Sequence, residues 1–234
     1  GMAKLDKDSN LIWKYDNRVH HDFDVAPISG TITTLIHEVV TSSENLYNSD
    51  SRRMTLDSLV VLSAQGEELK RVSIPDALAN SSYSLLLNHY QKNLAAWDRF
   101  HTNSVDVLSA DLAGKFPQFP EGSVLISLRN LNALAVIDLE KRQVIWAYNG
   151  LWRAQHSAHY LDNGNILLFD NKGHAVGKRI FSRLIEINPS TLAVNWSYTG
   201  SRENPFYTDF YGRVQRLENG NSLVVESLSS RLFE

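Results

Sequence analysis

The chain has 234 residues, of which 43% are hydrophobic and 21% are charged, proportions that are ordinary for a globular protein. A formal net charge of −3 gives no electrostatic reason to expect nucleic acid or an anionic membrane as a partner. No apolar run is long enough to span a bilayer. The chain has no cysteine, which excludes disulfides and thiol chemistry.

The first predicted elements are short strands. Residues 2–16, "MAKLDKDSNLIWKYD", fit two strands joined by a polar turn. Residues 20–40, "HHDFDVAPISGTITTLIHEVV", and 56–74, "LDSLVVLSAQGEELKRVSI", fit four more strands with glycine in their turns. Residues 76–100 have helical spacing of apolar side chains instead, so we expect a helical insertion that covers one face.

The second half of the chain repeats one order of elements: a strand, a break, a strand ending in Asp or Asn, a polar turn and a strand with tryptophan. Trp146 and Trp196 stand 50 residues apart. Four short strands in a unit of about 50 residues are typical of a β-propeller blade. The copies lie at 101–148, 156–198 and 212–234, after a more divergent copy at 20–74.

These observations predict an all-β fold, a single β-propeller domain over residues 1–234 with about four blades' worth of sequence. A β-sandwich also has many short strands, but it does not predict a repeated order of strand types. Two arrangements of the ends stay open. Residues 11–16, "LIWKYD", could complete the last blade and close a four-bladed ring, or the chain could be an arc of a six-bladed parent. Both ends of the chain look like the third strand of a blade, and this slightly favours the arc. We expect Trp13, Trp146 and Trp196 to pack between blades.

Histidines recur at the start of the innermost predicted strand. His21 lies nine residues before Gly30, and His156 lies eight residues before Gly164. His101 opens the same strand of the intervening copy. Because the innermost strands of a propeller line its channel, we expect these three rings to converge there. Asn103 points to the same side of its strand as His101.

A second set of polar residues lies seven positions after the turn glycines Gly30, Gly122 and Gly164. We expect this set to lie one layer further out, at the ends of the second strands: His37, Arg129 and Asn171. Of these, His37 and Asn171 are predicted to bind substrate together with Asn103, and Arg129 is predicted to be catalytic. We interpret the remaining histidines as structural: His20, His89, His159 and His174. Strand alternation predicts that His20 points away from His21.

The chemistry of three histidines with an arginine leaves several alternatives. Histidine is a common metal ligand, but Arg129 would repel a cation, and catalytic metal sites usually add a carboxylate or a further histidine. The forked guanidinium suits sulfate or phosphate. We therefore favour an oxyanion site without metal or cofactor, in which a neutral histidine attacks. A histidine–metal propeller enzyme and a non-catalytic propeller that binds a ligand or partner remain alternatives, and a homo-oligomer stays open.

Several motifs resemble those of the bacterial arylsulfate sulfotransferases. They are "VHHDFDV" with His21, "HTNSV" with His101 and Asn103, "LISLRN" with Arg129, and "QHSAHYLDNGNILLFDN" with His156. The resemblance extends over nearly all of the chain.

The resemblance implies a six-bladed propeller that transfers a sulfuryl group from a phenolic sulfate ester to a phenol, without a nucleotide donor. It implies that His156 is transiently sulfurylated, and that His101, Asn103 and Arg129 hold the sulfuryl oxygens. His21 would assist proton transfer with the phenol. Phenols and aryl sulfates would be the small-molecule partners. The family is typically exported, so the resemblance implies a periplasmic or secreted protein.

Overall fold

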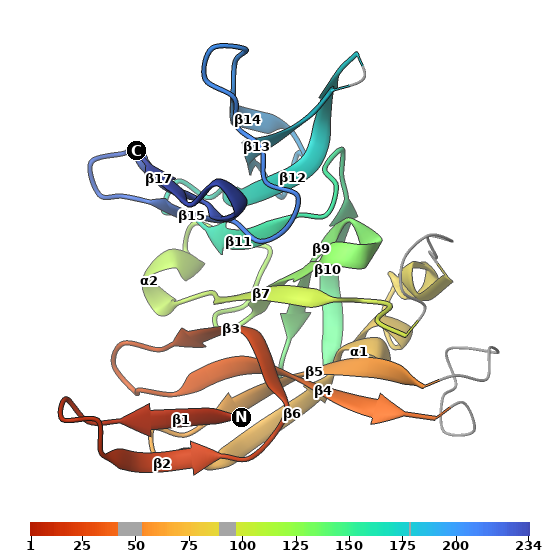
Figure 1. Cartoon of the computed structure of the whole chain (residues 1–234). Coiled ribbons are helices and arrows are strands. Elements are labelled where there is room, and N and C mark those ends of the chain that lie inside the picture. Colours follow the sequence, from red (N-terminus) through yellow and green to blue (C-terminus); the bar gives the residue numbers. More distant parts are fainter. Residues whose placement is uncertain (42–52, 89–96, 178) are drawn as a thin grey trace.

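Glycine-containing turns divide the chain into short strands, and each strand pairs antiparallel with its neighbours in sequence. The computed structural model describes residues 1–41, 53–88, 97–177 and 179–234. These residues form an all-β propeller of four blades, which confirms the predicted fold class (Figure 1). The three complete blades have four strands each and the last has three.

The blades follow one another along the chain. Blade 1 contains β3 (Val19–Val25), β4 (Ile32–Val40), β5 (Met54–Leu62) and β6 (Glu68–Ser73). Blade 2 contains β7 (Thr102–Val107), β8 (Val124–Leu128), β9 (Ala133–Asp138) and β10 (Gln143–Asn149). Blade 3 contains β11 (His156–Tyr160), β12 (Ile166–Val176), β13 (Arg179–Ile187) and β14 (Val194–Thr199). Blade 4 contains β15 (Arg213–Arg216), β16 (Ser222–Glu226) and β17 (Arg231–Phe233).

The hydrophobic core lies in layers between neighbouring blades. The central strands β8 and β9 are buried along their whole length, because a blade packs against each of their faces. Leu59 and Leu35 of blade 1 share a cluster with Ile126 of blade 2. Leu134 of blade 2 shares the next with Leu168 of blade 3. Sequential layers of this kind hold the innermost strands at fixed positions.

The innermost strands are also joined directly by hydrogen bonds. Asp22 on β3 accepts the N–H of Val105 on β7 at 3.2 Å, Ser104 on β7 accepts that of Ala158 on β11 at 3.2 Å, and Ser157 on β11 accepts that of Val214 on β15 at 3.1 Å. The strands β3, β7, β11 and β15 therefore stand side by side, as Figure 1 shows.

The hairpin of β1 (Met2–Leu5) and β2 (Leu11–Tyr15) forms a sheet of its own. It packs on blade 1, where the indole of Trp13 donates to the carbonyl of Ala64 at 3.0 Å. The pairing of "LIWKYD" with blade 4, one of the two arrangements that the sequence left open, is therefore not found, because β2 pairs with β1. Trp146 packs between blades 2 and 3 as predicted, whereas Trp196 is 38% exposed and stacks on Arg216.

Helical segments are short. Part of the predicted insertion forms α1 (Ile74–Ala79) and η2 (Ser84–Asn88), while residues 89–96, with His89, lie outside the described residues. α1 begins at Ile74 with Pro75 in its first turn, and it is capped by the Ser73 hydroxyl, which accepts the N–H of Asp76 at 3.3 Å. The other helical turns are α2 (Ala110–Ala113), η3 (Arg129–Leu131) and η4 (Ser227–Ser229).

Candidate functional site

Corresponding positions on the innermost strands can be assigned from the turn that follows each strand. Val25 pairs with Ile32, Val107 with Val124, Tyr160 with Ile166, and Arg216 with Ser222. Four residues before the first member of each pair stand His21, Asn103, His156 and Gly212. The structure therefore makes His21 and His156 equivalent, as predicted, and gives the position in blade 2 to Asn103 instead of His101.

These four corresponding residues line one central cavity of about 270 Å³. The cavity is also bordered by Asp22, Ser157, Tyr211, Arg213, Val225 and Ser227. Gly212 takes a φ of +97°, and a Cβ there would lie 2.7 Å from Phe169 Cζ, so only glycine fits. The fourth blade thus contributes no side chain at the position that corresponds to His156.

His156 has one defined tautomer. Its Nδ1 lies 2.8 Å from Asn171 Oδ1 and 3.1 Å from the carbonyl oxygen of Ala154. Both partners accept, so Nδ1 carries the hydrogen and Nε2 keeps its lone pair. Burial lowers the pKa of His156 to about 4, helped by the charges of Arg129 and His101. At neutral pH the ring is therefore uncharged, with a free lone pair in a side chain that lines the cavity.

The orientation of Asn171 is fixed by its surroundings. Its amide nitrogen donates to the carbonyls of Thr208 at 3.0 Å and Tyr211 at 2.8 Å, which turns Oδ1 toward His156. Asn171 is fully buried. It was predicted to bind substrate, but its contacts make it a support for the His156 ring.

The residue before His156 has a structural role. The buried amide nitrogen of Gln155 lies 2.9 Å from the carbonyl oxygen of Ala133 and 3.1 Å from Ser127 Oγ, so it ties β11 to blade 2. The backbone carbonyl of Gln155 accepts from Asn103 Nδ2 at 2.9 Å. Asn103 Oδ1 is buried and has no hydrogen-bond partner among the described residues. Asn103, which lines the central cavity, therefore carries a buried acceptor atom without a partner.

His101 lies just before β7 and contacts His21, with ring centroids 4.7 Å apart. Its Nδ1 lies 2.5 Å from Asp98 Oδ2. Burial raises the pKa of Asp98, but the hydrogen bonds with His101 and the charges of His101 and His21 together outweigh it and hold the pKa below its usual value. Asp98 is therefore ionised and His101 Nδ1 donates to it, as in other carboxylate-oriented histidines.

Arg129 opens η3, where its backbone N–H donates to the carbonyl of His101 at 3.3 Å. Its guanidinium donates to Asn130 Oδ1 at 2.8 Å. Burial lowers the pKa of Arg129, and the charges of Asp98 and Asp209 oppose this. Arg129 is not among the residues that line the central cavity. Its charge nevertheless reaches His156, whose pKa it lowers.

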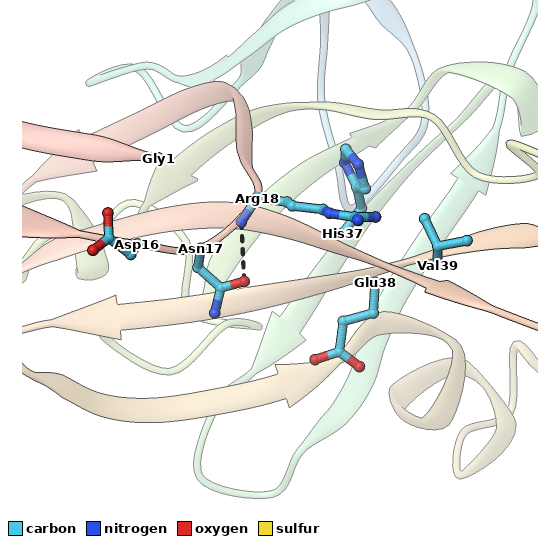
Figure 2. Close-up of a pocket in the computed structure, with 7 residues that line it drawn as sticks. All are labelled: Gly1, Asp16, Asn17, Arg18, His37, Glu38 and Val39. Carbon is cyan, nitrogen blue, oxygen red and sulfur yellow. Dashed lines mark hydrogen bonds between the residues drawn. The ribbon is translucent and has the colours of Figure 1, made fainter.

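A second cavity, of about 520 Å³, lies on the outside of blade 1 and is lined by Gly1, Asp16, Asn17, Arg18, His37, Glu38 and Val39 (Figure 2). The backbone N–H of His37 donates to the carbonyl of Arg18 at 3.2 Å. His37 was expected beside the substrate, yet it lines this outer cavity. Its ring lies 4.9 Å from that of His20.

His20 is the residue that sequence reasoning placed wrongly. Its Nδ1 lies 2.7 Å from Nδ1 of His21, so it does not point away from that ring. His37, His20, His21 and His101 thus form a continuous line of four rings, which we call the histidine row. A bulge in β3 after His20 allows this, because strict alternation would separate the two rings.

Further residues at the site had weaker signals. Asp57 on β5 lies 3.7 Å from His20 Nε2 and was not singled out. Arg213 pairs with Asp22 at 3.1 Å across 191 positions of sequence, a contact that no local pattern reveals. Ser227 could have been found, because it lies seven residues after Gly220 and so continues the series of His37, Arg129 and Asn171.

Two general features of the described part of the chain bear on the class of site. Within it, no group of three or more His, Asp or Glu side chains has an arrangement that could hold a metal ion. Its helices are all too short or too polar to cross a membrane.

The chain resembles structures that are already known. A protein of unknown function from Bacteroides caccae superposes with a TM-score of 0.59 at 10% identity, over 96% of this chain and 63% of that one. The virginiamycin B lyase of Staphylococcus aureus matches with a TM-score of 0.46 at 12% identity, over 94% of this chain and 56% of that one. The chain thus spans less than two thirds of the length of these structures. No curated protein matches it.

The family assignment comes from the whole sequence. The model of the family described as arylsulfotransferase (ASST) matches residues 1–234, which is the entire chain. This range includes the motifs around His21, His101, Arg129 and His156. The chain belongs to the arylsulfotransferase (ASST) family.

Proposed function

We propose that the protein transfers a sulfuryl group from an aryl sulfate to a phenol, with His156 as the nucleophile. The observation that carries this proposal is the single tautomer of His156. Asn171 and Ala154 hold the hydrogen on Nδ1, so the lone pair is on Nε2 in a ring that is neutral at neutral pH. A neutral imidazole with a free lone pair is a competent nucleophile.

The reaction has two displacements at sulfur. Nε2 of His156 forms a bond to sulfur as the bond from sulfur to the aryl oxygen breaks, and the phenolate leaves with the electron pair. A phenol oxygen then attacks sulfur, the bond from sulfur to Nε2 breaks, and the phenol proton passes to His21. The second displacement restores neutral His156, and a covalent intermediate divides the transfer into two easier steps.

The sulfuryl oxygens need fixed donors during both displacements. Arg129 and His101 carry this role in the proposal, and both lie close enough to lower the pKa of His156 by their charge. Asn103 lines the central cavity and has one amide hydrogen beyond the one it gives to Gln155.

The test is covalent labelling. The protein is incubated with 4-nitrophenyl sulfate alone, digested, and analysed by mass spectrometry for an added sulfuryl group on the peptide that contains His156. We expect one group per chain on that peptide and release of nitrophenol in equal amount. His156→Asn should abolish both, because the amide has no lone pair at the position of Nε2. His174→Asn is the matched control, since His174 lies outside the central cavity on β12. An unlabelled wild-type protein would refute the proposal.

A further inference from the structure

The histidine row connects the central cavity with the outer cavity at blade 1. His37 lines the outer cavity, as Figure 2 shows, and its ring lies 4.9 Å from His20. His20 Nδ1 lies 2.7 Å from His21 Nδ1, and His21 lines the central cavity. Imidazoles at these separations are the side chains best suited to pass protons near neutral pH. The row thus offers a path for a proton from the central cavity to the outside.

The contact between His20 and His21 decides where their hydrogens are. Two Nδ1 atoms 2.7 Å apart can share one hydrogen only, so one ring donates and the other accepts. His20 Nε2 is 3.7 Å from Asp57 Oδ1, and a carboxylate there favours a hydrogen on that nitrogen. His20 then accepts at Nδ1 and His21 donates from its own. This leaves the lone pair of His21 on Nε2.

The geometry points to His20 as the relay partner of His21, a residue that takes the proton of the acceptor phenol from His21 and passes it toward His37. This inference rests on the proposed function. As the phenol oxygen bonds to sulfur, its proton moves to Nε2 of His21, and the hydrogen on Nδ1 of His21 moves to Nδ1 of His20. The phenol has then lost one proton and His20 has gained one, with no other change.

The surroundings of His20 allow its ring to accept a proton but not to keep it at neutral pH. Asp57 on β5, 2% exposed, lies beside Nε2, and the charge of Asp98, in the segment before β7, also favours a proton on His20. Burial opposes it, as do His37 on β4 and His101. The balance lowers the pKa of His20 to about 4. An imidazolium formed there is short-lived and passes its proton on toward His37, whose ring lies 4.9 Å away.

The relay predicts a specific effect of His20→Asn. The asparagine amide can still hydrogen-bond His21 Nδ1, so it keeps the orientation of that ring, but it cannot take up a proton. In a single-turnover experiment the protein is first sulfurylated with 4-nitrophenyl sulfate and freed from donor. It is then discharged with phenol, which carries its proton, or with pentafluorophenol, which is ionised at neutral pH. Mass spectrometry follows the loss of the label.

We expect His20→Asn to slow discharge by phenol about tenfold or more, a part of the roughly hundredfold or greater effect of a proton-transferring group. Discharge by pentafluorophenol should stay within about twofold of wild type, because no proton has to move. His174→Asn should leave both rates unchanged. Equal slowing with both acceptors would make His20 a structural residue and overturn the relay, as would no slowing with either.

A measurement on the wild-type protein covers the case in which the variant does not fold. If two protons move in concert, the rate of phenol discharge should depend on the deuterium fraction of the solvent along a curve, whereas one moving proton gives a straight line. A straight line would overturn the relay while leaving sulfurylation of His156 intact. A wild-type protein that never acquires the label would overturn both proposals, and the two failures are therefore distinguishable.

Discussion

Replacing Asn171 with leucine tests the support of the His156 ring. Leucine keeps the branched arrangement of side-chain heavy atoms, although it is larger, and removes three hydrogen bonds, one from His156 and two to the carbonyls of Thr208 and Tyr211. At about 1 kcal/mol for each, with a further cost for a buried carbonyl left unpaired, the free energy of unfolding should fall by about 3 to 4 kcal/mol. With a urea dependence of about 2 to 3 kcal/mol per molar, the unfolding midpoint should drop by about 1 to 2 M.

The same substitution should slow labelling of His156 by 4-nitrophenyl sulfate between roughly tenfold and a hundredfold, the range for groups that orient a functional histidine. Nδ1 keeps only the longer contact to Ala154, so the ring loses its fixed direction. Asn195→Leu is the matched control, because Asn195 is exposed on β14 and donates one bond to Asn165. A midpoint and a labelling rate for Asn171→Leu that equal those of the control would refute the reasoning.

Three further predictions concern the oxyanion donor, acid sensitivity and the central cavity. Arg129→Ala should slow sulfurylation of His156 on the order of a hundredfold, the scale for one oxyanion donor, whereas Arg202→Ala in an exposed loop should not. His156 and His20 have folded pKa values of about 4, below the roughly 6.5 of the unfolded chain, so the unfolded state binds protons first. Urea unfolding should therefore show stability that is fully present above about pH 6.5 and falls toward pH 4 by up to about 3 kcal/mol for each histidine; a flat profile contradicts the burial of these rings. Gly212→Ala should cost about 2 kcal/mol more than Gly220→Ala, measured by thermal unfolding, since both have positive φ but only the first meets a neighbour, Phe169.

The sequence by itself determined the fold class and the strands that carry the candidate site residues. A repeated order of strands with glycine turns is a local pattern, and blades pair neighbouring strands, so local reading suffices for them. The positions of His21 and His156 follow from the same counting, because the strand that starts each blade lines the centre. In blade 2 the counting selected His101, whereas the structure gives the corresponding position to Asn103. Counting from the turns also found Asn171, although not its role.

Only the tertiary structure decided what each of these side chains does. The tautomer of His156 depends on Asn171, whose orientation is set by carbonyls 37 and 40 positions away in sequence. His20 lies against His21 because β3 has a bulge, which breaks the alternation on which its predicted direction relied. Hydrogen bonding and burial join residues that are distant in the chain, and a repeat pattern records the spacing of strands but not the partners of their side chains.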